Sequence, residues 1–310
     1  MTALIGPGDG SRAVALGGGH GLNRTLQALS HVVDHVTAVV TAADDGGSSG
    51  RLRRDLNVVP PGDMRMALAA LSPDEGLVRL LQYRFDRGEL GGHSLGNLII
   101  VALSELNTGD LVAGLDELAQ LLQVRGRVLP CTTTPVTLHA ETVNGSIAGQ
   151  VEVAQTPRVR RVWLEPSDVP ATSAAVDAIR RADLVVLGPG SLYTSIVPNL
   201  LVEDIGRAVA ASDAPVALVA NLREQPGETE GMDLADHLEA LHEHVPGLEL
   251  STVLVHDGPD PSGPGKRLHL RAEELAPWAG EVTATDLLDG ADGHDPHKLA
   301  RVFDQLLRGA

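Results

Sequence analysis

The chain has 310 residues, 43% apolar and 21% charged, a balance typical of a globular protein and not of a disordered one. Its formal net charge of −17 argues against nonspecific nucleic-acid binding and against attachment to an anionic membrane surface, because both need basic side chains. The only cysteine, Cys131, excludes an intrachain disulfide and indicates a reducing compartment. Met1 to Arg12 lacks a targeting pattern and no apolar run is long enough to span a membrane, so we expect a cytoplasmic protein.

The first third of the chain predicts a strand, a loop, a helix and a second strand. Ala13–Leu16 is an apolar run, Leu22–Val33 has helical spacing, and Val36–Thr41 is a β-branched run. This order is typical of the opening of a doubly wound sheet. Further helices are predicted at Asp63–Leu71, Glu75–Tyr83, Ser94–Leu106 and Asp110–Leu122.

The middle of the chain predicts short strands with hairpin-like spacing around an Asn144-Gly145 turn. These strands are Arg127–Cys131, Thr137–Val143, Ile147–Val153 and Arg160–Leu164. The rest predicts strands at Leu184–Leu187, Val216–Val219 and Thr252–Val255, helices at Ala171–Arg181, Asp233–His244 and Pro296–Leu307, and a surface loop at Asp257–Gly265. We therefore predict one Rossmann-like α/β domain over residues 1–310, with a mostly parallel sheet flanked by helices and a small antiparallel insertion near residues 127–165. A two-domain division is the alternative.

A glycine-rich loop follows the first predicted strand. Glycines there let the backbone approach a ligand closely, and the next helix offers free N–H groups to a phosphate. The spacing is not the dinucleotide fingerprint, since its third glycine falls on Leu22, and no Walker lysine follows. A tight turn without a ligand is the alternative. The predicted phosphate-binding residues are Gly17, Gly18, Gly19, His20 and Gly21.

A second loop, after the next strand, combines two carboxylates with glycines and hydroxyls. Such a loop suits a ribose or an anion, and paired Asp side chains also suit Mg²⁺. We predict a Mg²⁺ ligand in either Asp44 or Asp45, with the other side chain capping the loop. N-capping is the alternative role for the serines. The predicted residues are Asp44, Asp45, Gly46, Gly47, Ser48, Ser49, Gly50 and Arg51.

A third loop follows the buried strand at Leu184–Leu187 and again carries small residues and hydroxyls. The predicted binding residues are Gly188, Pro189, Gly190, Ser191, Tyr193, Thr194, Ser195 and Asn199. Further residues complete the predicted cleft: Arg65, His93, Ser94, Asn97 and Asn221. Asp63 is predicted as a helix N-cap, and Asp45 and His93 are the candidate catalytic groups.

Five motifs together resemble the gluconeogenesis factor family, the YvcK branch of the YvcK/CofD superfamily. They are Gly-Gly-Gly-His-Gly-Leu, Ala-Asp-Asp-Gly-Gly-Ser-Ser-Gly-Arg, Pro-Pro-Gly-Asp-Met-Arg, His-Ser-Leu-Gly-Asn and Gly-Pro-Gly-Ser-Leu-Tyr-Thr-Ser. The resemblance implies a Rossmann-like cytoplasmic protein that affects cell shape and growth on gluconeogenic carbon sources and binds a UDP-sugar or a related dinucleotide. The sister branch is similar to 2-phospho-L-lactate transferase, a Mg²⁺-dependent enzyme.

Three functions follow as hypotheses. The first is a regulatory protein that binds a nucleotide-sugar, acts with protein partners in cell-wall precursor metabolism, and is compatible with a homodimer. The second is a CofD-like, Mg²⁺-dependent phospholactyl transferase. The third, an NAD(P)-binding oxidoreductase, is the weakest because the third fingerprint glycine is missing.

Overall fold

The computed structural model describes residues 10–268, 275, 278–290 and 292–309, and a parallel β-sheet forms its centre. Seven strands pair in the order β10–β9–β8–β7–β1–β2–β3, and every pair is parallel. They are β1 (Arg12–Gly17), β2 (His35–Val40), β3 (Arg127–Pro130), β7 (Leu184–Leu187), β8 (Val216–Val219), β9 (Leu250–His256) and β10 (Ala279–Thr285). The predicted doubly wound α/β class is confirmed. The strand order reverses between β1 and β7, where such folds open a crevice.

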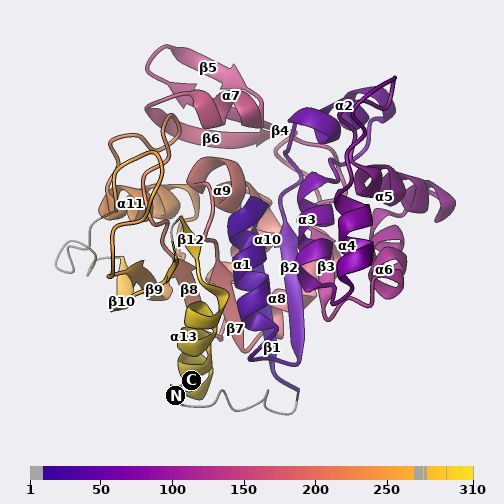
Figure 1. The fold of residues 1–310 in the computed structure, drawn as a ribbon. Coiled ribbons are helices and arrows are strands. Elements are labelled where there is room, and N and C mark those ends of the chain that lie inside the picture. Colours follow the sequence, from indigo (N-terminus) through magenta and orange to yellow (C-terminus); the bar gives the residue numbers. More distant parts are fainter. Residues whose placement is uncertain (1–9, 269–274, 276–277, 291, 310) are drawn as a thin grey trace.

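Helices flank both faces of this sheet, as Figure 1 shows. Central strands such as β7 and β8 are buried along their whole length, which explains their continuous apolar sequences. The helices are α1 (Gly19–Leu29), α2 (Gly47–Leu56), α3 (Gly62–Leu71), α4 (Glu75–Gln82), α5 (Leu95–Leu106), α6 (Leu111–Leu121), α7 (Gln150–Gln155), α8 (Ser173–Arg180), α9 (Val197–Leu200), α10 (Glu203–Ala210), α11 (Leu234–His244) and α13 (Pro296–Gly309), with a π-helical turn η1 (Leu192–Ile196).

A small antiparallel sheet lies beyond the carboxyl ends of the parallel strands, at the top of Figure 1. Its strands pair in the order β5–β4–β6 and span Gly145–Ala148, Thr137–Thr142 and Val159–Glu165. Two antiparallel strands of two residues each, β11 (Leu288–Asp289) and β12 (Gly293–His294), lie nearer the C-terminus.

Two predicted strands of the middle region were wrong in part. Arg127–Cys131 does not join the antiparallel group, because β3 pairs in parallel with β2 in the main sheet. Ile147–Val153 is not one strand, because β5 ends at Ala148 and α7 begins at Gln150. The break is at Gly149, whose φ of 112° suits glycine and ends the extended chain.

Two further local predictions need correction. The second loop is short, since α2 starts at Gly47 and takes the serines into its first turn. Asp63 is not an N-cap, because α3 has Pro61 at that position and Asp63 lies one residue inside the helix with its side chain partly buried. No helix in the described ranges has the length and apolarity needed to cross a membrane.

Candidate functional site

The first and third glycine-rich loops lie against each other at the carboxyl ends of β1 and β7. A Cβ atom at Gly21 would collide with the carbonyl oxygen of Pro189, so only glycine permits this approach. The Thr25 hydroxyl on α1 donates to the carbonyl of Gly188 at 2.8 Å. The parallel order of β1 and β7 thus joins two loops that are about 170 residues apart, at the switch point of the sheet.

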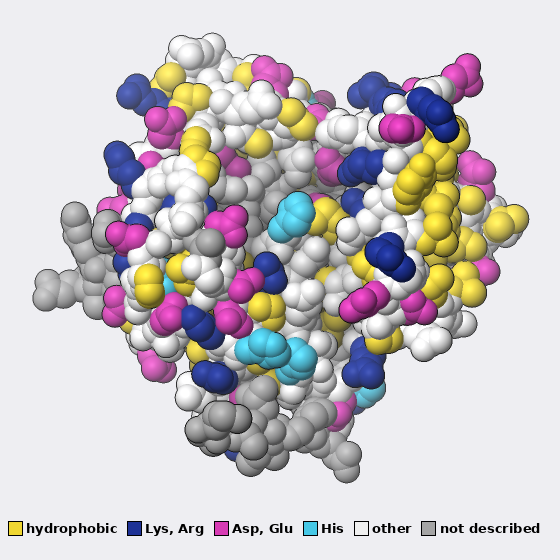
Figure 2. Space-filling view, viewed as in Figure 1, with side chains coloured by type: hydrophobic (Ala, Val, Ile, Leu, Met, Phe, Trp, Pro, Cys, Tyr) yellow, Lys and Arg dark blue, Asp and Glu magenta, His cyan; other side chains and the backbone are white. Residues whose placement is uncertain are grey.

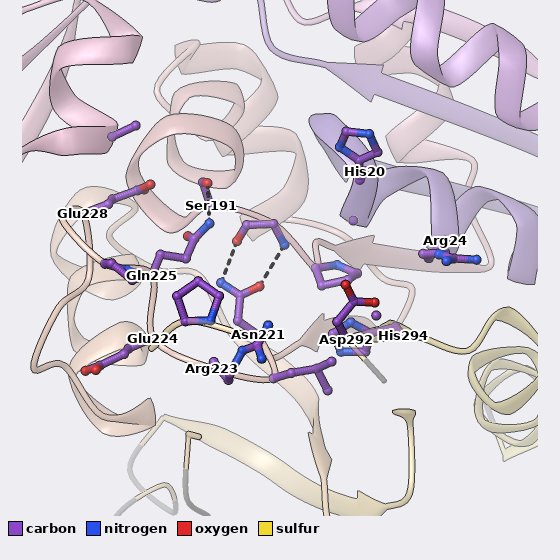
Figure 3. A pocket seen from close by; sticks show the side chains of 18 residues that line it. His20, Arg24, Ser191, Asn221, Arg223, Glu224, Gln225, Glu228, Asp292 and His294 are labelled. Carbon is purple, nitrogen blue, oxygen red and sulfur yellow. Dashed lines mark hydrogen bonds between the residues drawn. The ribbon is translucent and has the colours of Figure 1, made fainter. Parts of the chain in front are cut away.

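An open cavity of about 650 Å³ lies beside these loops, and Figure 2 shows the face of the molecule hollowed there. Figure 3 shows side chains from four segments around it: α1, the third loop, the segment after β8, and the region of β12. We call it the open cavity. It is lined by His20, Gly21, Arg24, Ala154, Pro189, Gly190, Ser191, Asn221, Leu222, Arg223, Glu224, Gln225, Pro226, Glu228, Pro264, Asp292, Gly293 and His294.

Asn221 holds the third loop in place at the edge of the open cavity. Its Oδ1 accepts the N–H of Gly190 at 3.0 Å, and its Nδ2 donates to the carbonyl of the same residue at 2.9 Å. Gln225 Nε2 donates to the Ser191 hydroxyl at 2.8 Å. Figure 3 shows this hydrogen bond together with the two between Asn221 and Gly190. The loop is therefore fixed by side chains that follow β8, not by its own turn alone.

Glu228 binds the turn that follows the third loop. Its carboxylate accepts the N–H groups of Tyr193 and Thr194 and the hydroxyl of Thr194. Burial raises the pKa of Glu228, although these hydrogen bonds oppose the shift. These three donor groups of η1 are thus turned toward Glu228, and Tyr193, Thr194 and Ser195 do not line the open cavity.

Asn199, the last predicted residue of the third loop, is fully buried. Its Nδ2 donates to the carbonyl oxygens of Gly17 and Ser195, at 3.1 and 2.8 Å. It therefore joins the first loop to η1 from beneath and does not face the open cavity.

Several polar atoms around the open cavity lack a partner within the described chain. Nη1 of Arg223 and Oε1 of Gln225 are both enclosed and make no hydrogen bond. Both atoms are shielded by protein, and the residues that carry them are half-buried and line the cavity. Two other charged side chains there are engaged: Arg24 forms a 3.0 Å ion pair with Asp289, and Glu224 accepts the N–H groups of Gly231 and Lys266.

His294 contributes a neutral imidazole to the same cavity. Its Nε2 contacts the carbonyl of Ala220 at 3.1 Å, which requires a protonated Nε2 and leaves Nδ1 as an acceptor. Burial lowers the pKa of His294 to about 4, so the ring carries no charge near pH 7.

The second loop builds a different arrangement, which we call the polar cluster: Asp44, Ser48, Ser49, Asp63, Arg65, His93 and Asn97. Arg65 Nε donates to Asn97 Oδ1 at 2.9 Å, and Asn97 Nδ2 donates to the Ser48 hydroxyl at 3.1 Å. The same hydroxyl lies 3.1 Å from His93 Nδ1. Helices α2, α3 and α5 therefore meet through a continuous chain of hydrogen bonds.

Charges within the polar cluster are strongly perturbed. Burial, together with the charge of Asp44, raises the pKa of Asp63 to about 7, and burial also raises the pKa of Asp44. Burial lowers the pKa of Arg65, and likewise that of His93. Asp63 Oδ1 accepts the N–H of Gly19 at 3.1 Å, which connects the cluster to the first loop.

The two neighbouring carboxylates of the second loop face different partners. Asp44 Oδ1 accepts the N–H of Gly46 at 2.9 Å and its side chain belongs to the polar cluster. Asp45 Oδ1 instead accepts the N–H of Val151 at 3.0 Å, in the first turn of α7. Asp45 therefore ties the second loop to the antiparallel part of the molecule.

The donor set suits Mg²⁺ only through one protein carboxylate plus water and ligand oxygens. Within the described ranges no group of three or more His, Cys, Asp or Glu side chains lies close enough to hold a metal. Mg²⁺ commonly keeps several waters and binds through one or two carboxylates and a substrate phosphate. Asp44, whose carboxylate keeps lone pairs beyond its bond to Gly46, is the better of the two candidates.

The remaining predicted residues support loops. Arg51 Nη2 donates to the carbonyl of Gly91 at 2.7 Å and so holds the segment before α5. The Ser94 hydroxyl donates to the carbonyl of Leu81 at 3.1 Å. The members of the predicted set that line the open cavity are His20, Gly21, Pro189, Gly190, Ser191 and Asn221. Those that do not line it are Gly17, Gly18, Gly19, Asp44, Asp45, Gly46, Gly47, Ser48, Ser49, Gly50, Arg51, Arg65, His93, Ser94, Asn97, Gly188, Tyr193, Thr194, Ser195 and Asn199.

Sequence reasoning missed the charged side chains that complete the open cavity. Arg223 and Glu224 follow β8 directly after Asn221, so their position past a strand end was a usable signal. Arg24 lies four residues after His20. The helical period therefore places both side chains on the same face of α1, which was a second usable signal. Asp292 and His294 come from a hairpin with no strand-end signal.

Comparison with known proteins gives one consistent result. The sequence profile of the 2-phospho-L-lactate transferase CofD family matches residues 13–282. The chain is 49% identical over 306 residues to a putative gluconeogenesis factor of Mycobacterium tuberculosis, covering 94% of this chain and 89% of the relative. It is 40% identical over 316 residues to the gluconeogenesis factor of Bacillus subtilis, covering 97% and 99%. A crystal structure of a UPF0052 family member from Bacillus halodurans superposes with a TM-score of 0.89 at 36% identity, covering 95% and 99%.

Proposed function

This chain belongs to the CofD/UPF0052 family and is a homologue of the gluconeogenesis factors, and from that premise we propose that it binds a UDP-sugar as a regulatory ligand. The ligand occupies the open cavity. Its diphosphate lies near the first turn of α1, and its remaining parts extend toward the segment after β8.

One observation carries this proposal: Arg223, a half-buried arginine with no acidic partner among the described residues, lines the open cavity together with the amino end of α1. The amino end of a helix favours anions through its free N–H groups and its dipole. A guanidinium binds a phosphate oxygen pair through parallel hydrogen bonds. A volume of about 650 Å³ is also within the range of cavities that hold small organic ligands.

The described lining residues include no Phe, Tyr or Trp, and their only rings besides proline are the imidazoles of His20 and His294, which bears on how the base is held. A uracil ring there meets Pro189, Pro226 and Pro264 together with amide groups, which favours edge-on hydrogen bonding over stacking. The cavity also lacks a hydroxyl or thiol paired with a base among its described residues, which favours binding over catalysis. We therefore propose a cytoplasmic regulator in cell-wall precursor metabolism that affects cell shape and growth on gluconeogenic carbon sources.

Isothermal titration of the purified protein tests the proposal directly. We expect saturable binding of UDP-N-acetylglucosamine, weaker binding of uridine, and at least tenfold weaker UDP-sugar binding by Arg223→Ala. Arg301→Ala, which removes an exposed arginine of α13, is the matched control and keeps the affinity. If the wild-type protein binds no nucleotide in this titration, the proposal fails.

A second function, CofD-like phospholactyl transfer, is favoured by the polar cluster. Asp63, with a pKa near 7, is a buried proton carrier next to Asp44, the candidate Mg²⁺ ligand. In that case Asp44 would hold the ion against a phosphate of the substrate, and Mg²⁺ would supply charge neutralisation. Transfer activity that depends on Mg²⁺ and disappears in Asp44→Asn would establish this function, and its absence with a folded protein would exclude it.

We also propose a homodimer through an apolar face on the α2 and α4 side, visible as yellow patches in Figure 2. Leu56, Leu80, Tyr83 and Leu90 are each about half exposed there, which is unusual for large apolar side chains grouped on a monomer surface. Light scattering of the wild type should give twice the monomer mass, and Leu80→Asp should give the monomer mass.

A further inference from the structure

A second cavity, of about 560 Å³, lies at the opposite end of the parallel sheet from the open cavity. It is located at the amino ends of β1, β2 and β3, which point away from the antiparallel sheet in Figure 1. We call it the basal cavity. It is lined by Arg12, Ala13, Val14, Asp34, His35, Val36, Thr37, Arg125, Gly126, Arg127, Leu129, Ala174, Ala178 and Arg181.

The floor of the basal cavity follows from strand register. Val14 pairs with Thr37, and Thr37 pairs with Arg127, so these three side chains form one row across β1, β2 and β3 on the same face of the sheet. Helix α8 covers this face and presents Ala174 and Ala178 to it. Because alanine side chains are short, the helix leaves a space above the row that larger residues would fill.

The rim of the basal cavity is strongly cationic. Four arginines line it, against one aspartate, in a protein with a net charge of −17. Arg127 is neutralised by Asp116, with contacts of 2.9 and 2.6 Å. Arg12, Arg125 and Arg181 have no acidic side chain within salt-bridge distance among the described residues. Three arginines without an acidic partner in the described ranges thus line one cavity.

Two carboxylates near the rim offset part of this positive charge, but neither forms an ion pair with its arginines. The Asp34 carboxylate accepts the backbone N–H of Gly10 at 2.7 Å, and Asp183 accepts the N–H of Arg12 at 2.7 Å. Both carboxylates therefore serve the backbone at the strand starts. Guanidinium groups left in this state are the usual ligands for carboxylates and phosphates, which they bind through paired hydrogen bonds.

We propose that the basal cavity binds a compact anion with at least two negative charges, and that this site is separate from the nucleotide site. Arg12, Arg125 and Arg181 hold the charged groups at the rim. Thr37 and the two alanines of α8, which are half-buried, contact its carbon or oxygen body. The anion is either a di- or tricarboxylate or a phosphate compound, since both offer oxygens in the geometry that guanidinium binds.

Isothermal titration at low ionic strength tests this site with two probes, citrate and inorganic pyrophosphate. At least one probe should bind with a stoichiometry of one per chain, and added salt should weaken the binding. If only citrate binds, the ligand is a carboxylate, and if only pyrophosphate binds, it is a phosphate. If neither probe binds, the proposal is overturned.

Three variants assign the binding to the basal cavity. Arg125→Ala combined with Arg181→Ala should weaken the probe at least tenfold, whereas Arg301→Ala should not. Ala178→Leu should block binding without any change of charge, because leucine keeps helix α8 intact and fills the space above the floor. Arg223→Ala separates the two cavities: it should leave the probe affinity unchanged. If Arg223→Ala abolishes binding and the basal variants do not, the anion lies in the open cavity and the proposal is wrong.

Discussion

The polar cluster and the open cavity lie at the same end of the parallel sheet, yet they are built in opposite ways. In the polar cluster the side chains of α2, α3 and α5 bond to one another, and Arg65, Ser48, His93 and Asn97 are each less than a tenth exposed. In the open cavity Asn221, Arg223 and Gln225 are half-buried and face a space, with two polar atoms left unpartnered. The side chains of the polar cluster bind one another, whereas those of the open cavity leave room for a ligand.

This difference separates two kinds of contribution to function. A buried, fully bonded network stabilises and positions the backbone, so its loss appears first in the free energy of unfolding. A half-buried group with a free donor contributes little to folding, and its loss appears in ligand affinity. Under the proposed function, the motif around Asp44 to Arg51 therefore supports the loops, while the residues after β8 contact the ligand.

The largest effect is expected for Arg65→Ala, which removes the cation from the polar cluster. Arg65 is only 6% exposed. Its loss leaves Asn97 Oδ1 without its hydrogen-bond donor and removes a positive charge near the carboxyl groups of Asp44 and Asp63. Removing one partner of a buried hydrogen bond costs about 1–3 kcal/mol, so we expect a loss in this range in urea unfolding followed by circular dichroism. Arg301→Ala, on the surface, should change the same quantity by less than about 0.5 kcal/mol. A loss below about 1 kcal/mol for Arg65→Ala would mean that the cluster is open to water.

The next effect is a pH dependence that Asp63 imposes on stability. Its pKa rises from 3.8 to about 7 on folding, so the folded protein binds this proton more tightly than the unfolded chain. The resulting stabilisation is fully present below about pH 4 and is lost as the pH rises toward 7, by about 1.4 kcal/mol for each pH unit. Asp63→Asn should lack this decline.

Urea unfolding of the wild type and of Asp63→Asn at several pH values between 4 and 7 measures the difference. The gap between the two proteins should grow with pH, in favour of the variant. If the free energies of unfolding of the two proteins change in parallel with pH, Asp63 is ionised in the folded protein. The polar cluster would then be accessible to water, as the open cavity is.

The fold could be predicted from sequence where burial is complete. β7 and β8 match their predicted ranges because continuous apolar runs between turn residues have one reading in a parallel sheet. β10 was not predicted, since it lies at the edge of the sheet and its seven residues, all exposed or half-buried, form no apolar run. Ile147–Val153 was predicted wrongly because six residues of α7 are too few to show a helical period.

The site could be predicted as three loops but not as a set of facing side chains. Strand order placed the loops together, since parallel strands end at one edge. Which side chain faces the ligand depends on the rotation of α2 and on the contact that turns Asp45 toward Val151, and neither is written in local spacing. Arg24 and His294 reach the open cavity from segments that no loop motif marks.

Asn221→Ala tests the open cavity itself and should affect binding more than folding. The variant loses both hydrogen bonds to Gly190, so the third loop is no longer held in its ligand-facing position. We expect a loss of roughly tenfold in UDP-N-acetylglucosamine affinity, about 1.4 kcal/mol, by isothermal titration. The free energy of unfolding should fall by about 1 kcal/mol or less, since the side chain is half-buried. A large loss of stability with unchanged affinity would reverse the assignment of the two regions.

The smallest effect is expected at Asp45, which lies between the two regions and has two possible roles. If its carboxylate acts only on the first turn of α7, through the N–H of Val151, Asp45→Ala should cost about 0.5–2 kcal/mol of stability, as other lost helix caps do. Asp45→Asn should then be nearly neutral, because asparagine caps equally well and needs no charge.

If Asp45 instead holds Mg²⁺, the charge is essential, so Asp45→Asn should lose a Mg²⁺-dependent gain in Tm that the wild type shows. Thermal unfolding of the three proteins with and without Mg²⁺ distinguishes the two roles. The hydrogen bond to Val151 favours the first role, with Asn and Asp equivalent and Ala alone destabilised.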